Sequence, residues 1–523
     1  MRARFALGTA VLLGAALRFF PIWFGLPYSH ARPDETTGLG HAAAILAGDP
    51  NPHFFNWPSL TLYLFAGAFT AATAIGGTLS RIDQFLIARA LVALAGTATI
   101  LVVARIGRQI ADNATATIAA TFLAVAVVHV RDSHFATTDV LMTLLVTASL
   151  SLLHDARDTG ALRDYAIAGL VAGLAVSAKY SAAPVAVAVF FARGDGRRGW
   201  VAAAIFLAAM AGGFLTGTPY AIADFTALRT DLLYERAHLA AGHAGSAAPA
   251  WRAHLSRSLP YGLGPGIFIA AITGCFPLWR RYRHAAIPLV AFAIVFSIAI
   301  GVGRTAFLRY VLPLVPIACV SAAVCVHAMS VFLARRMRVG AGAVAFVLAL
   351  IVAAPSVINS AWLDILLART DTRVLAAEWV SPQLRAEHTV YDAGGDYTKL
   401  ELGATAFHEW RYDAGTKRFV GADDRTPEWI VLYDSPLQAY ASIDSSLRVL
   451  TSAKYTLVYE VRGSATRQGG IFDPQDAFFL PIAGFRGTVR PGPNVYVYRR
   501  VGELSARVES SPSGRGASSA AAR

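Results

Sequence analysis

Apolar stretches of membrane-spanning character fill most of the first 360 residues of this chain. A helix needs about 20 mostly apolar residues to cross a bilayer. Only 15% of the 523 residues are charged, against about 25% in an ordinary soluble domain. A cytosolic enzyme, a coiled coil and a disordered chain are therefore excluded. We predict a multi-spanning α-helical protein with about 11 transmembrane helices, some of them short, at 5–25, 84–108, 112–130, 137–154, 163–178, 180–193, 200–218, 261–279, 285–303, 307–334 and 339–359.

The balance of charge changes near residue 360. Residues 1–360 hold 27 basic and 14 acidic residues, whereas residues 361–500 hold 16 and 17. The later part has the composition of a soluble domain, with short β-rich runs between helical stretches and turn signals. We expect a transmembrane domain at 1–360 and an α/β domain at 361–502. The residues at 503–523, rich in Ser, Gly, Ala and Arg, are expected to form a disordered tail.

Arginines gather in alternate short loops between the apolar stretches. Of the 27 basic residues, 15 lie in these loops, and such an excess marks the cytoplasmic side of a membrane. The alternation holds only if the run 58–80 does not cross. We therefore interpret 35–48 and 58–80, within an outer loop region at 26–83, as helices at the outer membrane face. This predicts a cytoplasmic N-terminus and an extracytoplasmic C-terminal domain, in a cytoplasmic (inner) membrane.

Two adjacent carboxylates, Asp34 and Glu35, open the first outer loop. Carboxylates at the bilayer surface could supply a general base or hold a cation. Alternatively, Asp34 caps the helix that follows, and Glu35 faces the dipole of that helix. The spacing favours the cap slightly, and the two roles can coexist.

The same outer loop also carries three histidines, at His30, His41 and His53. Their spacing is not that of a tight ligand set, so the sequence favours no metal site there. Trp57 and Tyr63 have the character of interfacial anchors.

The second outer loop, residues 129–139, ends on a carboxylate that enters an apolar helix. Asp139 is followed by Val-Leu-Met-Thr, and a charge at this depth needs a partner or an aqueous cavity. A role in a site and a structural pair with Arg131 are equally open.

Cations on the predicted outer side have few nearby partners in the sequence. Lys179 is the only lysine in the first 360 residues, and it is either a snorkelling residue or an ammonium placed for a phosphate. Arg304, Arg309 and Tyr310 flank the turn into a later span, and no acidic residue occurs between Glu235 and Asp364. A phosphate would suit these arginines, and anchoring to lipid headgroups is the alternative.

Taken in order, these features resemble the GT-C glycosyltransferases that use polyprenyl-phosphate sugars, the superfamily of protein O-mannosyltransferases and lipid A aminoarabinose transferases. The agreement covers residues 5–320. One departure is Pro58-Ser59-Leu60, where many members have Pro-Pro-Leu. The resemblance rests on Asp34-Glu35, Asn56-Trp57-Pro58-Ser59-Leu60, Asp139, Gly173-Leu174-Ala175 with Lys179, and Arg309-Tyr310-Val311-Leu312-Pro313.

The resemblance implies an inverting sugar transfer at the outer membrane face. Asp34 would accept the proton of the acceptor, while Glu35 and Asp139 position the acceptor or a bound cation. Arg131 and His53 would lie on the acceptor side. The implied partners are a polyprenyl-phosphate-linked sugar and a protein, lipid or glycan acceptor. No cofactor is certain, and whether a divalent metal takes part is left open. The donor phosphate would be held by Lys179, Arg304, Arg309 and Tyr310.

Two other functions compete with this one. A transporter or flippase of lipid-linked sugars also places polar residues in the membrane, but near its midplane and within two repeated halves. Here the polar residues collect at the outer ends of spans, and no repeat is visible. A polysaccharide polymerase or ligase would use similar donors and move whole glycans. No residue of the C-terminal domain stands out in the sequence.

Overall fold

The computed structural model describes residues 2–244, 248–403, 407–413, 415–420, 426–465 and 469–501. The predicted tail at 503–523 lies outside them. The chain forms two compact units. Unit 1 combines Met1–Arg369 with Gln468–Thr488, and unit 2 combines Thr370–Arg467 with Val489–Arg523.

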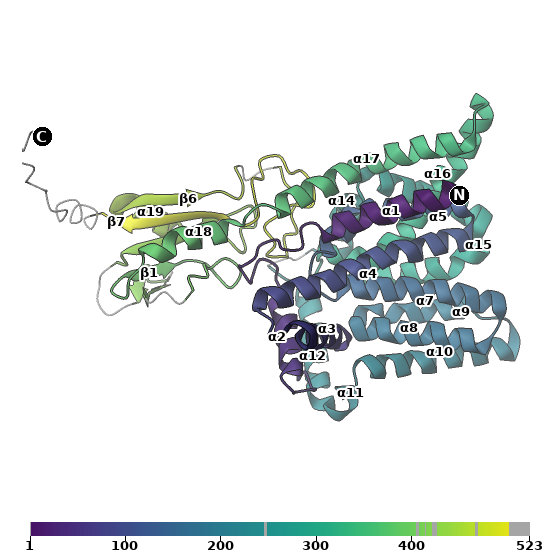
Figure 1. Cartoon of the computed structure of the whole chain (residues 1–523), viewed down its shortest axis with the longest axis horizontal. Helices are drawn as coiled ribbons and strands as arrows, with labels where there is room; N and C mark the ends of the chain where they lie inside the picture. Colours follow the sequence, from purple (N-terminus) through teal and green to yellow (C-terminus); the bar gives the residue numbers. More distant parts are fainter. Residues whose placement is uncertain are drawn as a thin grey trace, which may run out of the picture. The chain divides into compact units, whose positions relative to one another are not determined.

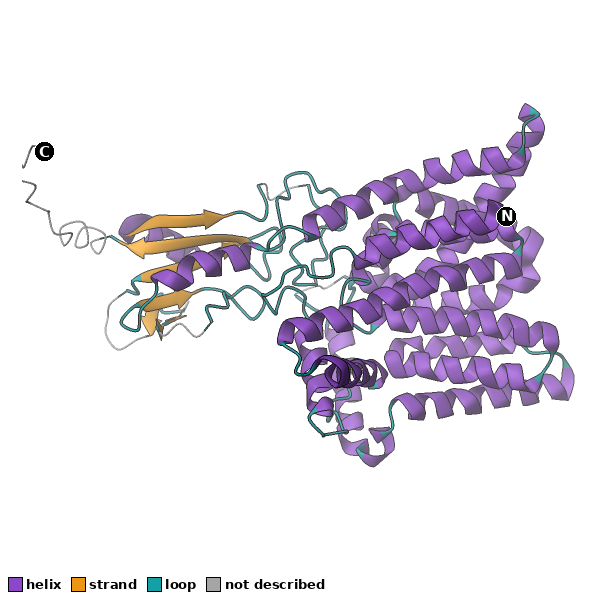
Figure 2. Cartoon of the chain, in the orientation of Figure 1, coloured by secondary structure: helices purple, strands orange, loops and turns teal. Residues whose placement is uncertain are grey.

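Unit 1 is a bundle of helices (Figures 1 and 2). Among the described residues, six helices are long and apolar enough to cross a membrane: α4 (Arg81–Ile110), α7 (Asp139–Thr159), α10 (Gly196–Gly217), α15 (Pro265–Gly301), the η3–α16 helix (Leu308–Met337) and the α17 helix with its extension (Ala341–Gln383). The prediction of a multi-spanning helical protein is confirmed. The remaining helices include α1 (Arg2–Phe19), α5 (Asn113–Val125), α6 (Val127–Asp132), α8 (Leu162–Ala178), η1 (Tyr180–Ala186) and α9 (Val187–Ala192).

The predicted spans 261–279 and 285–303 both fall within α15 (Pro265–Gly301), in which two helices meet at a kink. The backbone departs from helical geometry only at Tyr282 (φ −126°, ψ 19°), between the two predicted spans. The connecting residues Arg280–His284 include no glycine or proline that would end a helix. The two predicted spans therefore lie on either side of this kink, with no long loop between them.

Shorter helices gather at one end of the bundle. They are α2 (Glu35–Leu46), α3 (Leu60–Gly76), α11 (Tyr220–Ala223) and α12 (Phe225–Ala241). In Figure 1, α3 is seen nearly end-on, whereas α4, α7, α8 and α10 run across the picture. The helix at 58–80 thus lies across the direction of the bundle.

Close packing of α8 against α10 fixes the end of α8. A Cβ at Gly169 would lie 2.2 Å from the Phe206 carbonyl oxygen, and one at Gly173 would lie 2.0 Å from that of Met210. Only glycine permits this approach, which is how membrane helices pack through small residues. The packing holds the C-cap of α8, Lys179, at a defined position.

Unit 2 is a small α/β domain, as predicted. Its five-stranded sheet has the order β2-β1-β5-β7-β6, with β1 parallel to β2 and β5, and β7 antiparallel to β5 and β6. All six residues of β5 are buried. The strands are β1 (Thr389–Asp392), β2 (His408–Glu409), β5 (Trp429–Asp434), β6 (Tyr455–Val461) and β7 (Asn494–Arg500), with a β3–β4 hairpin (Arg411–Asp413, Arg418–Val420) and helices α18 (Thr372–Val380) and α19 (Ser445–Lys454).

The connection from β6 to β7 leaves unit 2. Its described residues 469–488, which we call the returning segment, belong to unit 1. An antiparallel bridge between Ile471 and Ala483 closes the segment into a loop. A stretch of the C-terminal region is therefore part of the helical unit, which the division at residue 360 did not anticipate.

Candidate functional site

Seven charged side chains of unit 1 meet in what we call the charge cluster. Its members come from the loop after α1, from α6, from the start of α7, from the end of α8, from η3 (Leu308–Leu314) and from the returning segment. They are Arg32, Asp34, Arg131, Asp139, Lys179, Arg309 and Asp476.

Arg309 faces three carboxylates. Its Nη2 donates a hydrogen bond to Asp34 Oδ2 (2.9 Å), and its Nη1 donates one to Asp476 Oδ2 (3.3 Å). Its Nε lies 3.7 Å from Asp139 Oδ2. The sequence offered Arg309 no nearby acidic partner, and the fold supplies partners from distant parts of the chain.

Asp139 and Lys179 form a second ion pair of the cluster. Lys179 Nζ donates to Asp139 Oδ1 at 2.6 Å and lies 4.9 Å from the centre of the Tyr310 ring. Asp139 is the first residue of α7, where the helix dipole favours a negative charge. Arg131 does not pair with Asp139 and instead bonds Asp476, so the alternative of an Arg131–Asp139 pair is wrong.

Asp34 and Glu35 are neighbours in very different surroundings. Asp34 has a left-handed backbone (φ 74°), and its side chain makes no capping bond to α2, so the cap interpretation is wrong. The side chain of Asp34 is 33% exposed. Glu35 is fully buried and accepts bonds from Arg89 Nε (2.8 Å), Arg89 Nη2 (2.6 Å) and the backbone N–H of Ala136 (2.8 Å). Glu35 thus ties the loop to α4 and to the second outer loop.

Asp476 was missed in the sequence. It is buried, and it accepts bonds from Arg32 Nη1 (2.6 Å), Arg131 Nη2 (3.2 Å) and Arg309 Nη1 (3.3 Å). Burial acts to raise the pKa of Asp476, but the three guanidinium groups outweigh burial and lower it. A signal was present, since apolar residues such as Phe478 and Phe479 follow it in an otherwise polar domain.

The returning segment also holds the backbone that leads to Arg309. Asp473 Oδ2 accepts a bond from the N–H of Leu308 (2.7 Å), and Gln475 Oε1 accepts one from that of Ala306 (2.6 Å). Gln475 Nε2 donates to the Arg304 carbonyl (3.1 Å). Burial, together with the nearby Asp476 carboxylate, raises the pKa of Asp473.

Like Glu35, the predicted site residues Arg304 and His53 have no side-chain hydrogen bond or ion pair with a member of the cluster among the described residues. The side chain of Arg304 is exposed. His53 is 63% exposed and lies 3.4 Å from carboxylate oxygens of Asp49 and Asp224. Within the described ranges, no group of three or more His, Cys, Asp or Glu side chains is placed to hold a metal ion.

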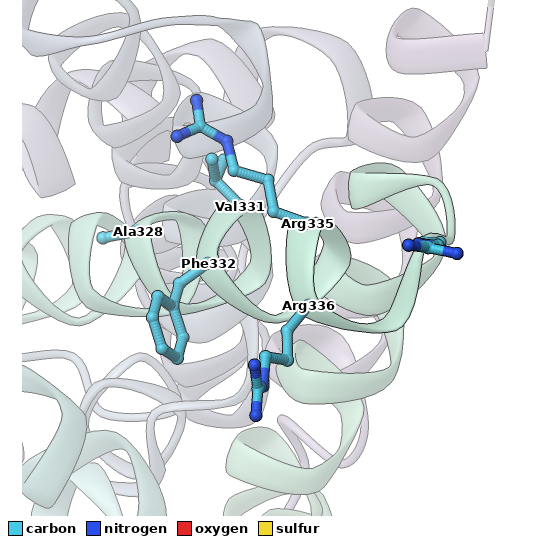
Figure 3. Close-up of a pocket in the computed structure, with 6 residues that line it drawn as sticks. Ala328, Val331, Phe332, Arg335 and Arg336 are labelled. Atoms are coloured by element: carbon cyan, nitrogen blue, oxygen red, sulfur yellow. The ribbon is translucent and has the colours of Figure 1, made fainter.

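A cavity of about 620 Å³ lies elsewhere, at the end of α16 (Val315–Met337). Arg335 and Arg336 extend to opposite sides of this helix (Figure 3). Because the guanidinium groups do not converge on one point, we interpret them as part of the topology signal and not as a ligand site.

One protein family and several solved membrane-protein structures are similar to this chain. A family model described as dolichyl-phosphate-mannose-protein mannosyltransferase matches residues 69–222. The oligosaccharyltransferase of Archaeoglobus fulgidus, with a tethered acceptor peptide, is 15% identical at a TM-score of 0.53, covering 76% of this chain and 62% of that chain. ArnT of Cupriavidus metallidurans, bound to undecaprenyl phosphate, is 13% identical at a TM-score of 0.52, covering 94% and 97%. This chain has the GT-C fold.

The predicted resemblance to GT-C glycosyltransferases is thereby confirmed. A complex of the archaeal enzyme with an inhibitory peptide and dolichol-phosphate also matches, with 16% identity, a TM-score of 0.50 and coverage of 73% and 58%. The chain thus spans about three-fifths of the archaeal chains in these two matches. No curated protein sequence matches it. The family match supports the predicted enzyme class, a glycosyltransferase, and the reaction is proposed below.

Proposed function

We propose that this protein transfers a sugar from a polyprenyl-phosphate donor to an acceptor hydroxyl, with inversion at the anomeric carbon. The observation that carries the proposal is a partly exposed carboxylate, Asp34, beside the cations of a charge cluster in a GT-C fold. The family match to a mannosyltransferase model, and the polyprenyl-type phosphates bound by two structural neighbours, support a lipid-linked donor.

Asp34 is the proposed general base. The acceptor oxygen attacks the anomeric carbon, the bond from that carbon to the phosphate oxygen breaks, and the electron pair leaves with the polyprenyl phosphate. The acceptor proton passes to Asp34. A single displacement inverts the anomeric centre.

Lys179 is the proposed contact to the leaving phosphate. Its side chain is 19% exposed and its ammonium is paired with Asp139, so it can meet a ligand without losing its position. Cations placed where negative charge develops stabilise the transition state. We propose that Arg309, the exposed Arg304 and the nearby Tyr310 complete this side of the site, with Asp139 positioning Lys179.

Other predicted residues receive adjusted roles in the proposal. Glu35 is buried and accepts three hydrogen bonds from Arg89 and the Ala136 N–H. We propose that it positions the loop that carries Asp34 and does not touch the substrate. Arg131 supports Asp476. His53 is exposed, which suits contact with an acceptor on the loop side.

The proposed setting is a cytoplasmic membrane. We propose about 11 crossings, with the N-terminus inside and unit 2 outside, because this arrangement places the arginine-rich loops in the cytoplasm. A lipid-linked donor would then reach the charge cluster from the outer leaflet.

The test uses proteoliposomes with a labelled polyprenyl-phosphate sugar. The wild type should release polyprenyl phosphate, and Asp34→Asn should lower the rate about 100- to 10,000-fold because the base is lost. Asp158→Asn, which alters an exposed carboxylate near the other end of α7, is the matched control and should keep full turnover. Full turnover in Asp34→Asn would overturn the base assignment. Solute movement without any lipid-linked sugar would favour a transporter, and transfer of whole glycans a polymerase or ligase.

A further inference from the structure

Three guanidinium groups converge on the single carboxylate of Asp476, in the returning segment. Arg32, Arg131 and Arg309 all donate to it, at 2.6, 3.2 and 3.3 Å. Arg32, Arg131 and Asp476 have side chains exposed by 2% or less. Burying charges is unfavourable unless they are paired. The Asp476 carboxylate is the shared partner of three buried arginines, and it therefore fixes their positions relative to one another.

Arg309 is held from two directions by this arrangement. One terminal nitrogen bonds Asp476, and the other bonds Asp34. A planar guanidinium with both ends bonded cannot turn about its stem. Asp476 therefore determines the direction in which Arg309 presents Nη2 to Asp34.

The backbone of Arg309 is fixed by the same segment. Asp473 and Gln475 accept bonds from the N–H groups of Leu308 and Ala306, so the residues just before Arg309 are held on the segment. The aromatic ring of Phe478 lies 4.9 Å from that of Phe135, centre to centre. Polar and aromatic contacts thus both hold the segment in unit 1.

We propose that Asp476 is a positioning residue of the transfer reaction. It holds Arg309 against Asp34 and so makes a segment from the C-terminal region part of the reaction centre. This inference rests on the proposed function. It assigns Asp476 no contact with substrate, because its carboxylate is buried among arginines.

The test compares Asp476→Asn with Asp476→Glu in the same transfer assay on the full chain. Asp476→Asn should lower kcat about 10- to 100-fold, since small misplacements of catalytic groups carry losses of this size. The donor KM should stay near the wild-type value, because Lys179 still contacts the phosphate and Arg309 acts on the charge that develops in the transition state. Asp476→Glu keeps the charge and should give an intermediate kcat. Asp396→Asn, an exposed carboxylate of unit 2, should behave as the wild type.

Three results would overturn the proposal. They are a wild-type kcat in Asp476→Asn, a raised donor KM with unchanged kcat in either variant, and an equal loss of kcat and thermal stability in both variants. If both variants lost kcat and thermal stability to the same extent, Asp476 would only hold the returning segment in unit 1. If Asp476→Asn does not fold, Asp476→Glu carries the test, with a lowered kcat and an unchanged KM expected. Failure of the proposed function is separate, because the wild type itself would then release no polyprenyl phosphate.

Discussion

Two groups of polar residues in unit 1 are built from neighbouring parts of the chain, and they use their arginines differently. In the inner group (Arg18, His129, His134 and Asp364), Arg18 donates to the carbonyls of Gly14 (2.8 Å), Ala124 (3.0 Å) and Leu123 (2.9 Å). In the charge cluster, all three nitrogens of Arg309 face carboxylates.

The inner group satisfies backbone carbonyls at the break between helices α5 and α6. The backbone turns at Ala126, between α5 and α6, and two carbonyls just before this turn, those of Leu123 and Ala124, accept bonds from Arg18. His134 lies against the carbonyls of Val130 and Phe20, and burial lowers its pKa to about 4, so that it is neutral at pH 7. Every group in this set is buried.

The charge cluster differs because two of its charges reach solvent. Asp34 and Lys179 are partly exposed, although each is paired. A buried arginine that satisfies backbone carbonyls is structural, whereas cations and carboxylates that share partners and are partly exposed can meet a substrate. Two substitutions in the charge cluster and one in the inner group test this distinction, and a fourth, in unit 2, tests how burial alone affects a carboxylate.

The largest effect is expected for Arg309→Met. It removes the cation shared by Asp34, Asp139 and Asp476, and should lower kcat about 100- to 1,000-fold. Breaking buried pairs should also reduce the free energy of unfolding by about 3–5 kcal/mol. Turnover and denaturation of the purified protein measure the two effects. Arg280→Met, an exposed arginine of α15, is the control. A folded variant with normal turnover would remove Arg309 from the site.

Lys179→Ala should act on donor binding. A charge-assisted hydrogen bond contributes about 1.5–3 kcal/mol, so the donor KM should rise about 10- to 100-fold. The acceptor KM should stay the same. Initial rates with each substrate varied separately measure both constants. A change confined to the acceptor KM would be incompatible with a phosphate role for Lys179.

Arg18→Met should separate the inner group from the cluster. Unsatisfied carbonyls at the end of α5 should lower the free energy of unfolding by about 1–3 kcal/mol. The kcat of the folded protein should be unchanged, because Arg18 touches no member of the charge cluster among the described residues. A lower kcat without a loss of stability would reverse the two assignments.

The smallest effect, on pH dependence alone, is expected at Asp392 in unit 2. This buried carboxylate accepts bonds from Gly394, Leu400 and Tyr433, and burial raises its pKa to about 6. A raised native pKa gives stability that is present below about pH 4 and is lost as the pH rises through about 6. The stability advantage of the wild type over Asp392→Asn should therefore shrink between pH 4 and pH 7 in denaturation experiments. A constant or growing advantage would contradict this.

The sequence predicted the helical architecture because a span is a local property of consecutive apolar residues. It also located Asp34, Asp139, Lys179 and Arg309, since charges beside apolar runs are conspicuous. Their pairing was not predictable, because Arg309 lies 275 residues from Asp34 and Asp476 lies 444 residues from Arg32.

Local patterns misled in two places. Asp34 stands where a cap residue stands, but its carboxylate turns to Arg309. Residues 469–488 follow a strand of unit 2, but pack in unit 1. In both cases the observed partners lie far away in the sequence, and no short-range spacing encodes such contacts.

The most direct measurement is mass spectrometry of the glycans and glycoproteins of the cell envelope, with and without this protein. We predict that removing the protein abolishes one defined sugar addition, that the wild-type chain restores it, and that Asp34→Asn does not. Envelope glycans that are unchanged by removal, or fully restored by Asp34→Asn, would contradict sugar transfer from a lipid phosphate at Asp34.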